Sequence, residues 1–210
     1  IKTNIVINAV ATATPLAPGI KLVNNAVEII NGNDNFSGVA DMLNTASNSL
    51  VKASTFDEMT NLSKADRQKL SETCKISKVG VEHKFVSKID GTVKFLYRLD
   101  DDNLIETVVM KYHHGYSICV SCQVGCRMGC VFCQSTKSGL IRHLLPGEIL
   151  GQILVAQKEL DIRISNIVMM GIGEPLDNFD NVMRFLALVT DEKGVNISMR
   201  NISLSTCGIV

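Results

Sequence analysis

The spacing of hydrophobic positions changes along the chain, and the change predicts the order of its structural elements. Between Val39 and Leu50 apolar residues recur every three or four positions, which predicts an amphipathic helix. Further on the spacing shortens: residues 81–89 and 93–99 read as strands that flank Asp90-Gly91, a dipeptide typical of hairpin turns. A third strand is predicted over 104–112. We therefore expect a small antiparallel segment in the first half of the chain.

From about residue 117 the pattern alternates between strand and helix. Three strands are predicted with helices between them; in chain order the elements are strand 117–123, helix 146–160, strand 165–170, helix 179–189 and strand 201–206. Repeated βα units predict an α/β fold with a parallel sheet, whose functional site lies at the carboxyl ends of the strands. The third strand is expected to leave an unpaired sheet edge.

Composition divides the chain into three segments. Residues 1–54 are rich in Asn and small side chains, carry almost no charge and offer no chemistry. Residues 55–115 hold a short helical stretch and the antiparallel strands, and residues 116–210 hold the βα units. The second segment opens with two pairs that are typical of helix N-termini: Thr55 with Glu58, and Ser63 with Asp66.

Overall composition limits the choice of partners and compartment. The 210 residues have a formal net charge of zero, so no global field attracts nucleic acid or a membrane, and RNA contacts require a local basic patch. Seven cysteines without a pairing pattern favour a reducing, cytoplasmic compartment over a secreted disulfide framework. No apolar run reaches the length of a membrane span. Residues 5–17 are interrupted by Asn8 and Pro15, and we do not interpret them as a signal peptide.

The most informative motif is a run of three cysteines, Cys126, Cys130 and Cys133, with gaps of three and then two residues. Three thiolates bind three corners of a [4Fe–4S] cluster and leave one iron open. An open iron can hold the amino and carboxylate groups of S-adenosylmethionine and pass it one electron, which is radical chemistry. Phe132 could pack on a bound adenine, although an ordinary core phenylalanine is an equal interpretation.

Zinc is the main alternative. Structural zinc sites use four ligands, and Cys122 together with the triplet would supply four thiolates. The resulting spacing is unusual for a zinc knuckle, so the cluster is favoured.

A second motif follows the next predicted strand, and a third ends the last one. Glycines in Gly171-Ile172-Gly173-Glu174-Pro175 allow close approach of the backbone, and the Glu174 carboxylate can accept hydrogen bonds from an ammonium group. By itself such a turn is more often ordinary loop structure. Ser205 and Cys207 close the third strand. All three motifs are therefore expected at one rim of the sheet.

Together these motifs resemble the radical-SAM adenine-C2 methyltransferases of 23S rRNA and tRNA (the RlmN type), over about residues 55–210. The resemblance is carried by the triplet and by five further stretches, namely 56–62 (FDEMTNL), 91–95 (GTVKF), 119–126 (CVSCQVGC), 170–176 (MGIGEPL) and 203–208 (SLSTCG). It implies a partial (β/α) barrel of radical-SAM type, preceded by a small antiparallel β segment and a helical N-terminal region.

The resemblance also implies residue roles. Cys126, Cys130 and Cys133 match the ligands of a [4Fe–4S] cluster, and three other positions match residues that bind S-adenosylmethionine: Gly173, Glu174 and Ser205. Glu106 matches a general base that removes the adenine proton. Cys119 matches the cysteine that releases the protein–RNA thioether by forming a disulfide. Taken alone, Glu106 would be a solvent-facing carboxylate and Cys119 a buried strand cysteine.

In that family a deoxyadenosyl radical activates a methyl group carried by a further cysteine, and the carbon radical adds to C2. No cysteine here matches the methyl carrier, and residues 1–54 do not match the family's N-terminal domain. We therefore expect this chain to be an incomplete and inactive fragment. The implied partners are 23S rRNA, tRNA and an external electron donor, with a monomeric state.

RNA contacts have modest direct support. One basic group surrounds the cysteine loop (Arg127, Lys137, Arg142, His143) and another precedes it (Lys111, His113, His114), and either could meet phosphates near the active rim. A solvated charged loop is an equal interpretation. Three alternatives remain open: a C8-adenine methyltransferase, another radical-SAM enzyme, and a non-catalytic metal-binding module.

Overall fold

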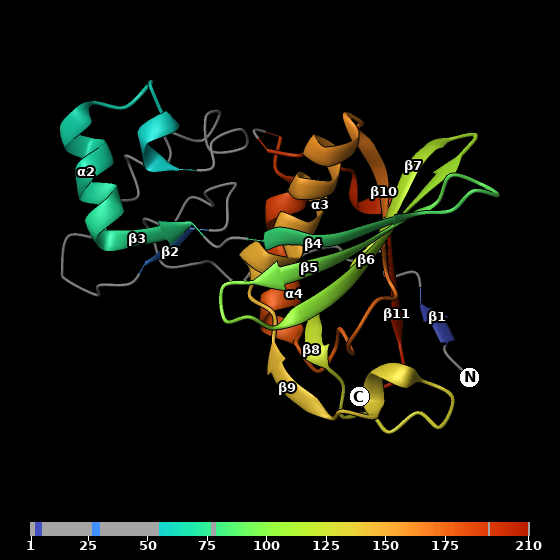
Figure 1. Cartoon of the computed structure of the whole chain (residues 1–210). Coiled ribbons are helices and arrows are strands. Elements are labelled where there is room, and N and C mark those ends of the chain that lie inside the picture. Colours follow the sequence, from blue (N-terminus) through green and yellow to red (C-terminus); the bar gives the residue numbers. More distant parts are fainter. Residues whose placement is uncertain (1–2, 6–26, 30–54, 77–78, 193, 210) are drawn as a thin grey trace.

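The computed structural model describes residues 3–5, 27–29, 55–76, 79–192 and 194–209. A seven-stranded sheet in the order β1-β11-β10-β7-β6-β5-β4 forms its centre (Figure 1). The strands are β1 Thr3–Ile5, β4 Val79–Val86, β5 Val93–Leu99, β6 Leu104–Tyr112, β7 Gly115–Cys119, β10 Ile164–Met169 and β11 Ile202–Thr206. Strands β7, β10 and β11 are parallel, and the other pairs are antiparallel. The predicted antiparallel segment and the predicted partial barrel are thus one continuous sheet.

The antiparallel strands form where polar and apolar residues alternate. In β5, Val93, Phe95, Tyr97 and Leu99 are buried, and the residues between them are partly exposed, as expected for a sheet covered on one face. The hairpin between β4 and β5 differs from the prediction. Strand β4 ends at Val86, and residues 87–92 form a longer loop in which the Asp90 carboxylate accepts from the Thr92 backbone N–H at 3.1 Å.

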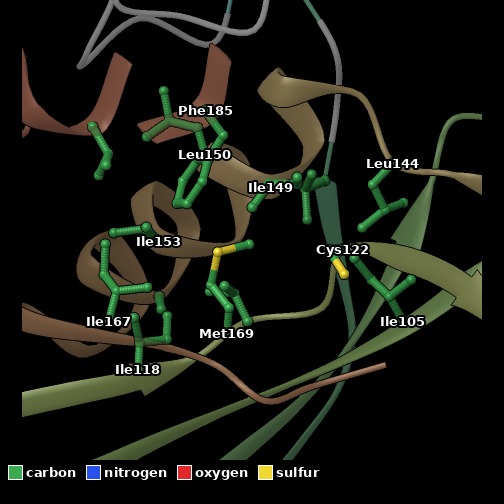
Figure 2. Packing of buried hydrophobic residues seen from close by; sticks show 14 of the residues in the cluster. Ile105, Ile118, Cys122, Leu144, Ile149, Leu150, Ile153, Ile167, Met169 and Phe185 are labelled. Carbon is green, nitrogen blue, oxygen red and sulfur yellow. The ribbon is translucent and has the colours of Figure 1, made fainter. Parts of the chain in front are cut away.

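Two helices cover one face of the sheet. Helices α3 (Pro146–Leu160) and α4 (Phe179–Thr190) begin at the predicted residues, since proline suits the first turn of α3. Figure 2 shows their apolar side chains against strands β7 and β10: Ile149, Leu150, Ile153 and Phe185 with Ile118, Ile167 and Met169. Each fully buried aliphatic side chain contributes about 1.5–3 kcal/mol. On the opposite sheet face, the side chains of β5 and β6 that alternate with the buried ones are partly or fully exposed.

Smaller elements flank the sheet. They are η1 Phe56–Glu58, α2 Lys64–Thr73, the β2–β3 pair (Val27–Ile29, Cys74–Ile76), the β8–β9 pair (Gln123–Gly125, Leu140–His143), η2 Gln134–Thr136 and η3 Met199–Asn201. The second capping pair is confirmed, because the Ser63 hydroxyl accepts from the Asp66 backbone N–H at 3.1 Å. In the first pair, the Thr55 hydroxyl donates to Glu58 Oε1 at 3.2 Å. The helix predicted over 39–50 lies outside the described residues.

The sheet edge at β11 is paired, so the prediction of an open edge there is wrong. Strand β1 runs antiparallel to β11, with Thr3 opposite Thr206 and Ile5 opposite Leu204. These partners are about two hundred positions apart in the sequence, and no local pattern connects them. The ladder between β1 and β11 occupies backbone groups that would otherwise offer a template to a second chain.

Candidate functional site

The predicted strand 117–123 is divided, and the division builds the rim of the sheet. Strand β7 ends at Cys119, and the backbone of 120–122 then binds the turn that follows β10. The Gly171 backbone N–H donates to Val120 O at 3.1 Å, and the Cys122 N–H donates to Ile172 O at 2.9 Å. The chain then leaves the sheet to form β8. The cysteine loop and the glycine turn therefore lie side by side, as predicted.

Within the cysteine loop, Cys126 is buried, and Cys130 and Cys133 are partly exposed. The loop is anchored by its backbone: the Cys126 N–H donates to Gly139 O at 2.9 Å, and the Cys133 N–H donates to Cys130 O at 3.0 Å. Burial raises the pKa of the Cys126 thiol, and the negative charges of Cys133, Cys130 and Glu174 raise it further. A bound cation would favour the thiolate form of Cys126.

Three thiolates are the donor set that a [4Fe–4S] cluster with one open iron requires. In the part of the chain that the structure describes, no three His, Cys, Asp or Glu side chains converge on a point where one metal ion could sit. A [4Fe–4S] cluster needs a wider arrangement, because each thiolate binds its own iron. Phe132, between two of the cysteines, is 72% exposed, so it is not a core residue and stays available to a ligand.

Neighbouring residues leave no room for a side chain at either glycine of the turn. A Cβ on Gly171 would lie 2.5 Å from Val120 O. Gly173 has φ +110°, and a Cβ there would lie 2.7 Å from the Cβ of Gln123 and 2.9 Å from Cys122 Sγ. The close approach inferred from the sequence is thus made to the segment that leads into the cysteine loop. A contact of Gly173 with S-adenosylmethionine remains a prediction.

Glu174 is 3% exposed and joins the second motif to the third. Its carboxylate accepts from the Cys207 backbone N–H at 2.7 Å and from the Leu176 N–H at 3.1 Å. Burial by itself would raise the pKa of Glu174, but the hydrogen bonds from Cys207, Thr206 and Leu176 outweigh it, and the net pKa is lowered. The hydrogen bonds from Cys207, Thr206 and Leu176 hold the carboxylate in a fixed orientation at the rim of the sheet.

The lowered pKa gives a stability prediction for Glu174→Gln. A carboxyl group whose pKa falls on folding stabilises the native state above its unfolded pKa, and this contribution is lost as pH falls through the folded value. We expect the variant to lose about 1–3 kcal/mol of unfolding free energy at pH 7, as typical for a charged buried hydrogen bond. Below about pH 4.5, the ordinary value for Glu, the difference should shrink.

Urea unfolding at pH 7 and at lower pH values measures this difference. Glu159→Gln, on the exposed side of α3, is the matched control and should change stability by less than about 0.5 kcal/mol. If Glu174→Gln destabilised the protein equally at all pH values, the stabilising role of the ionised Glu174 carboxylate would be contradicted.

Three further predicted residues lie on the sheet face opposite the helices. Cys119 is opposite Val108 in β6, and Glu106 is two positions along the same strand, so Glu106 and Cys119 are diagonal neighbours, typically about 7–8 Å apart. Glu106 forms an ion pair with Lys94 (Nζ–Oε1 2.7 Å). Ser205 belongs to the same face by register, and its buried hydroxyl has no hydrogen-bond partner among the described residues. An unsatisfied buried hydroxyl suits a ligand-binding role.

The two basic groups fare differently. Lys111 lies near the end of β6, and His113 and His114 form the turn into β7. This end of the two strands is far from Cys119 and the cysteine loop, so the predicted place of these residues near the active rim is wrong. The reason is that β6 runs antiparallel to β7. Near the loop, the two Nη atoms of Arg142 each donate to the Glu148 carboxylate at 2.8 Å, and its Nε donates to Asp101 Oδ2 at 2.6 Å. These contacts limit the availability of Arg142 to phosphates.

Sequence reasoning missed two buried glutamines. Gln152 of α3 accepts from the Thr107 hydroxyl at 2.7 Å and from the Ser121 N–H at 2.9 Å, and donates to Ser121 O at 2.9 Å. Gln123 of β8 accepts from the Glu174 N–H at 2.9 Å and donates to Asp177 at 2.8 Å. A polar residue inside an apolar helical stripe is a signal that could have pointed to Gln152; for Gln123 there is no local signal.

The structure thus places a three-cysteine loop at the carboxyl rim of a sheet of βα units. Residues 120–210 match the model of the radical SAM superfamily. A crystal structure of a radical SAM methyltransferase from Sphaerobacter thermophilus superposes with a TM-score of 0.68 at 38% sequence identity, covering 75% of this chain and 47% of that one. The expected α/β class with a partial barrel is confirmed.

Curated relatives make the likeness more specific. The probable dual-specificity RNA methyltransferase RlmN of Clostridium novyi (strain NT) is 59% identical over 155 residues, 74% of this chain and 45% of that protein. The protein of the same name from Lachnospira eligens is 56% identical over 161 residues, 75% of this chain and 45% of that protein. The predicted resemblance to RlmN-type radical SAM methyltransferases is therefore confirmed. The chain spans about half the length of these relatives.

Among the described residues, no helix combines the length and apolar character that crossing a membrane requires.

Proposed function

We propose that this chain provides the cluster-binding part of a radical SAM enzyme that methylates C2 of adenine in 23S rRNA and tRNA. The observation that carries the proposal is the convergence of the triplet loop, the glycine turn and the end of β11 at one rim, joined by Glu174. When bound, the cluster and S-adenosylmethionine supply the one-electron chemistry that an unreactive aromatic carbon needs. All other roles belong to the protein's own side chains.

Cys126, Cys130 and Cys133 would hold the cluster. The Gly173–Glu174 turn and the Ser205 hydroxyl would bind S-adenosylmethionine, and the buried Ser205 hydroxyl has no hydrogen-bond partner among the described residues. Glu174 and Ser205 belong to segments distant in sequence, which the hydrogen bond from the Cys207 N–H to the Glu174 carboxylate joins.

On the open sheet face, Glu106 would take the proton from adenine C2, and Lys94 would hold its carboxylate in position. Cys119, the diagonal neighbour of Glu106, would attack the thioether sulfur and release the product as it forms a disulfide. The second cysteine of that disulfide has no counterpart that we assign in this chain. We further propose an external electron donor, a monomer and a cytoplasmic location.

The test is anaerobic reconstitution of the chain with iron and sulfide, followed by reduction with dithionite in the presence of S-adenosylmethionine and unmodified rRNA or tRNA. Formation of 5′-deoxyadenosine is expected without RNA methylation, because no cysteine of this chain is assigned as the methyl carrier. Formation of 2-methyladenosine would support the C2 position and contradict the expectation that the chain is inactive. 8-Methyladenosine would contradict the C2 assignment. A chain that takes up zinc, gains no iron–sulfur absorption and leaves S-adenosylmethionine intact would contradict the radical SAM assignment as a whole.

A further inference from the structure

A bidentate ion pair links the cysteine loop to the turn after β10. Arg127 follows the first cysteine of the triplet, and its guanidinium Nε donates to Asp177 Oδ2 at 3.0 Å. The Nη2 of the same guanidinium donates to Asp177 Oδ1. A guanidinium that meets a carboxylate through two parallel hydrogen bonds fixes both distance and orientation.

The pair is part of a larger network around a buried carboxylate. The Asp177 side chain is only 6% exposed. It also accepts from Gln123 Nε2 at 2.8 Å, and the same Nε2 lies 3.0 Å from His143 Nδ1. The other end of the Gln123 amide accepts from the Glu174 backbone N–H at 2.9 Å. Arg127, Asp177, Gln123 and Glu174 therefore form a continuous chain of contacts from the triplet to the turn.

The pair has one exposed and one buried member. The Arg127 side chain is 59% exposed, whereas the buried Asp177 carboxylate keeps the hydrogen bond from Gln123 when Arg127 is replaced. The loop is already anchored through the Cys126 N–H to Gly139 O, and the turn through Gly171 to Val120. What the pair adds is a fixed relation between two segments that are fifty residues apart in the sequence.

We propose that Arg127 and Asp177 are positioning residues that set the distance between the cluster loop and the S-adenosylmethionine-binding turn. The inference rests on the proposed function. Arg127 moves with Cys126, and Asp177 moves with Glu174, because the Asp177 backbone N–H donates to Glu174 O at 3.1 Å. Without the pair the loop still binds a cluster, but its open iron and the turn no longer meet the same ligand at the correct spacing. Small displacements of this kind weaken binding strongly.

The test compares Asp177→Asn, Arg127→Gln, Arg127→Lys and the double variant Asp177→Asn/Arg127→Gln in the reconstituted chain. Iron content should equal that of the unsubstituted chain. The dissociation constant for S-adenosylmethionine should rise about tenfold in Asp177→Asn and in Arg127→Gln, the loss expected for one charged hydrogen-bonded link. The change that S-adenosylmethionine causes in the EPR spectrum of the reduced cluster should be lost or broadened.

The variants also test whether the two residues act together. The double variant should bind no more weakly than the weaker single variant, because both substitutions remove one link. Arg127→Lys keeps the positive charge but cannot form the two parallel hydrogen bonds of the guanidinium, so its affinity for S-adenosylmethionine should be intermediate. Arg98→Gln, which breaks the partly exposed Arg98–Glu82 pair (2.9 Å) elsewhere on the sheet, is the matched control and should bind normally.

Two results would overturn the inference. One is unchanged affinity and unchanged EPR spectra in both single variants. The other is loss of iron from both, which would assign the pair to cluster assembly. Failure of the proposed function is recognised separately, because the unsubstituted chain would then load no cluster or would not bind S-adenosylmethionine.

Discussion

Replacing Cys126 by serine is expected to abolish iron–sulfur loading of this chain. Cys126 is the most buried of the three predicted ligands, and its thiol shares an electrostatic environment with Cys130 and Cys133. A cluster held by three thiolates has no spare ligand, so removal of one should lower iron retention by about tenfold or more, beyond the effect typical of outer contacts. Iron and sulfide content, the broad visible absorption and the EPR signal of the reduced protein measure the loss.

Two other cysteines serve as controls for this experiment. Cys122 is buried, and Cys207 is exposed at the end of β11. Cys122→Ala and Cys207→Ser should both keep full iron content, because neither belongs to the triplet. If Cys122→Ala removed the metal together with Cys126→Ser, four thiolates would be ligands, and the three-cysteine assignment would be wrong.

The second large effect is expected for Gly125→Ala, immediately before the first ligand. Gly125 has φ +74°, and a Cβ there would lie 2.0 Å from the carbonyl oxygen of Gly139. That carbonyl accepts the hydrogen bond from the Cys126 N–H, so the methyl group strikes the anchor of the loop. Overlap with backbone and a left-handed conformation together should lower the unfolding free energy by about 3–5 kcal/mol. Denaturant unfolding measures the change.

Gly129→Ala is the matched control for the steric part of this effect. Gly129 lies in the same loop with φ +67°, but a Cβ there would meet nothing within 4 Å. Its substitution carries only the cost of the left-handed conformation, about 1–2 kcal/mol. Equal destabilisation by the two substitutions would show that the contact between Gly125 and Gly139 is not tight.

The two substitutions also separate folding from metal binding. Cys126→Ser changes one atom and should leave the apoprotein as stable as before to within about 1–2 kcal/mol. Gly125→Ala should reduce both stability and iron loading, because the loop that presents Cys126 is displaced. A substitution that removes iron without changing the free energy of unfolding therefore identifies the replaced residue as a ligand.

Much of the secondary structure could be read from the sequence. Helix α3 has the predicted bounds, because a proline at its start and a regular apolar stripe are local signals. Strand β6 likewise coincides with the predicted 104–112, because alternation and the preceding turn define it. The hairpin between β4 and β5 was less predictable, since the Asp90 carboxylate closes a longer loop by binding the Thr92 N–H.

The candidate site was only partly readable. The cysteine spacing, the glycine turn and the strand–helix order were sufficient to place three motifs on one rim. The hydrogen-bond partners of Glu174 could not be predicted, because the Cys207 N–H that donates to it lies 33 positions away in the sequence. The same holds for Arg127 and Asp177, whose pairing depends on how the loop and the turn are oriented. Lys111 precedes the cysteine loop closely in sequence but lies opposite Tyr116, at the end of β7 away from Cys119, because β6 and β7 are antiparallel.

The sequence by itself determined the elements and the type of chemistry, because periodicity, capping residues and the spacing of three thiols act over a few positions. The tertiary structure alone decided which segments meet. It pairs β1 with β11, divides the strand after Cys119, and buries Asp177 beneath Arg127. These contacts satisfy backbone and charged groups that must be satisfied once buried, and their partners are chosen by the packing of distant segments. The spacing of the three cysteines predicts cluster binding, and the tertiary contacts fix how their loop lies against the glycine turn.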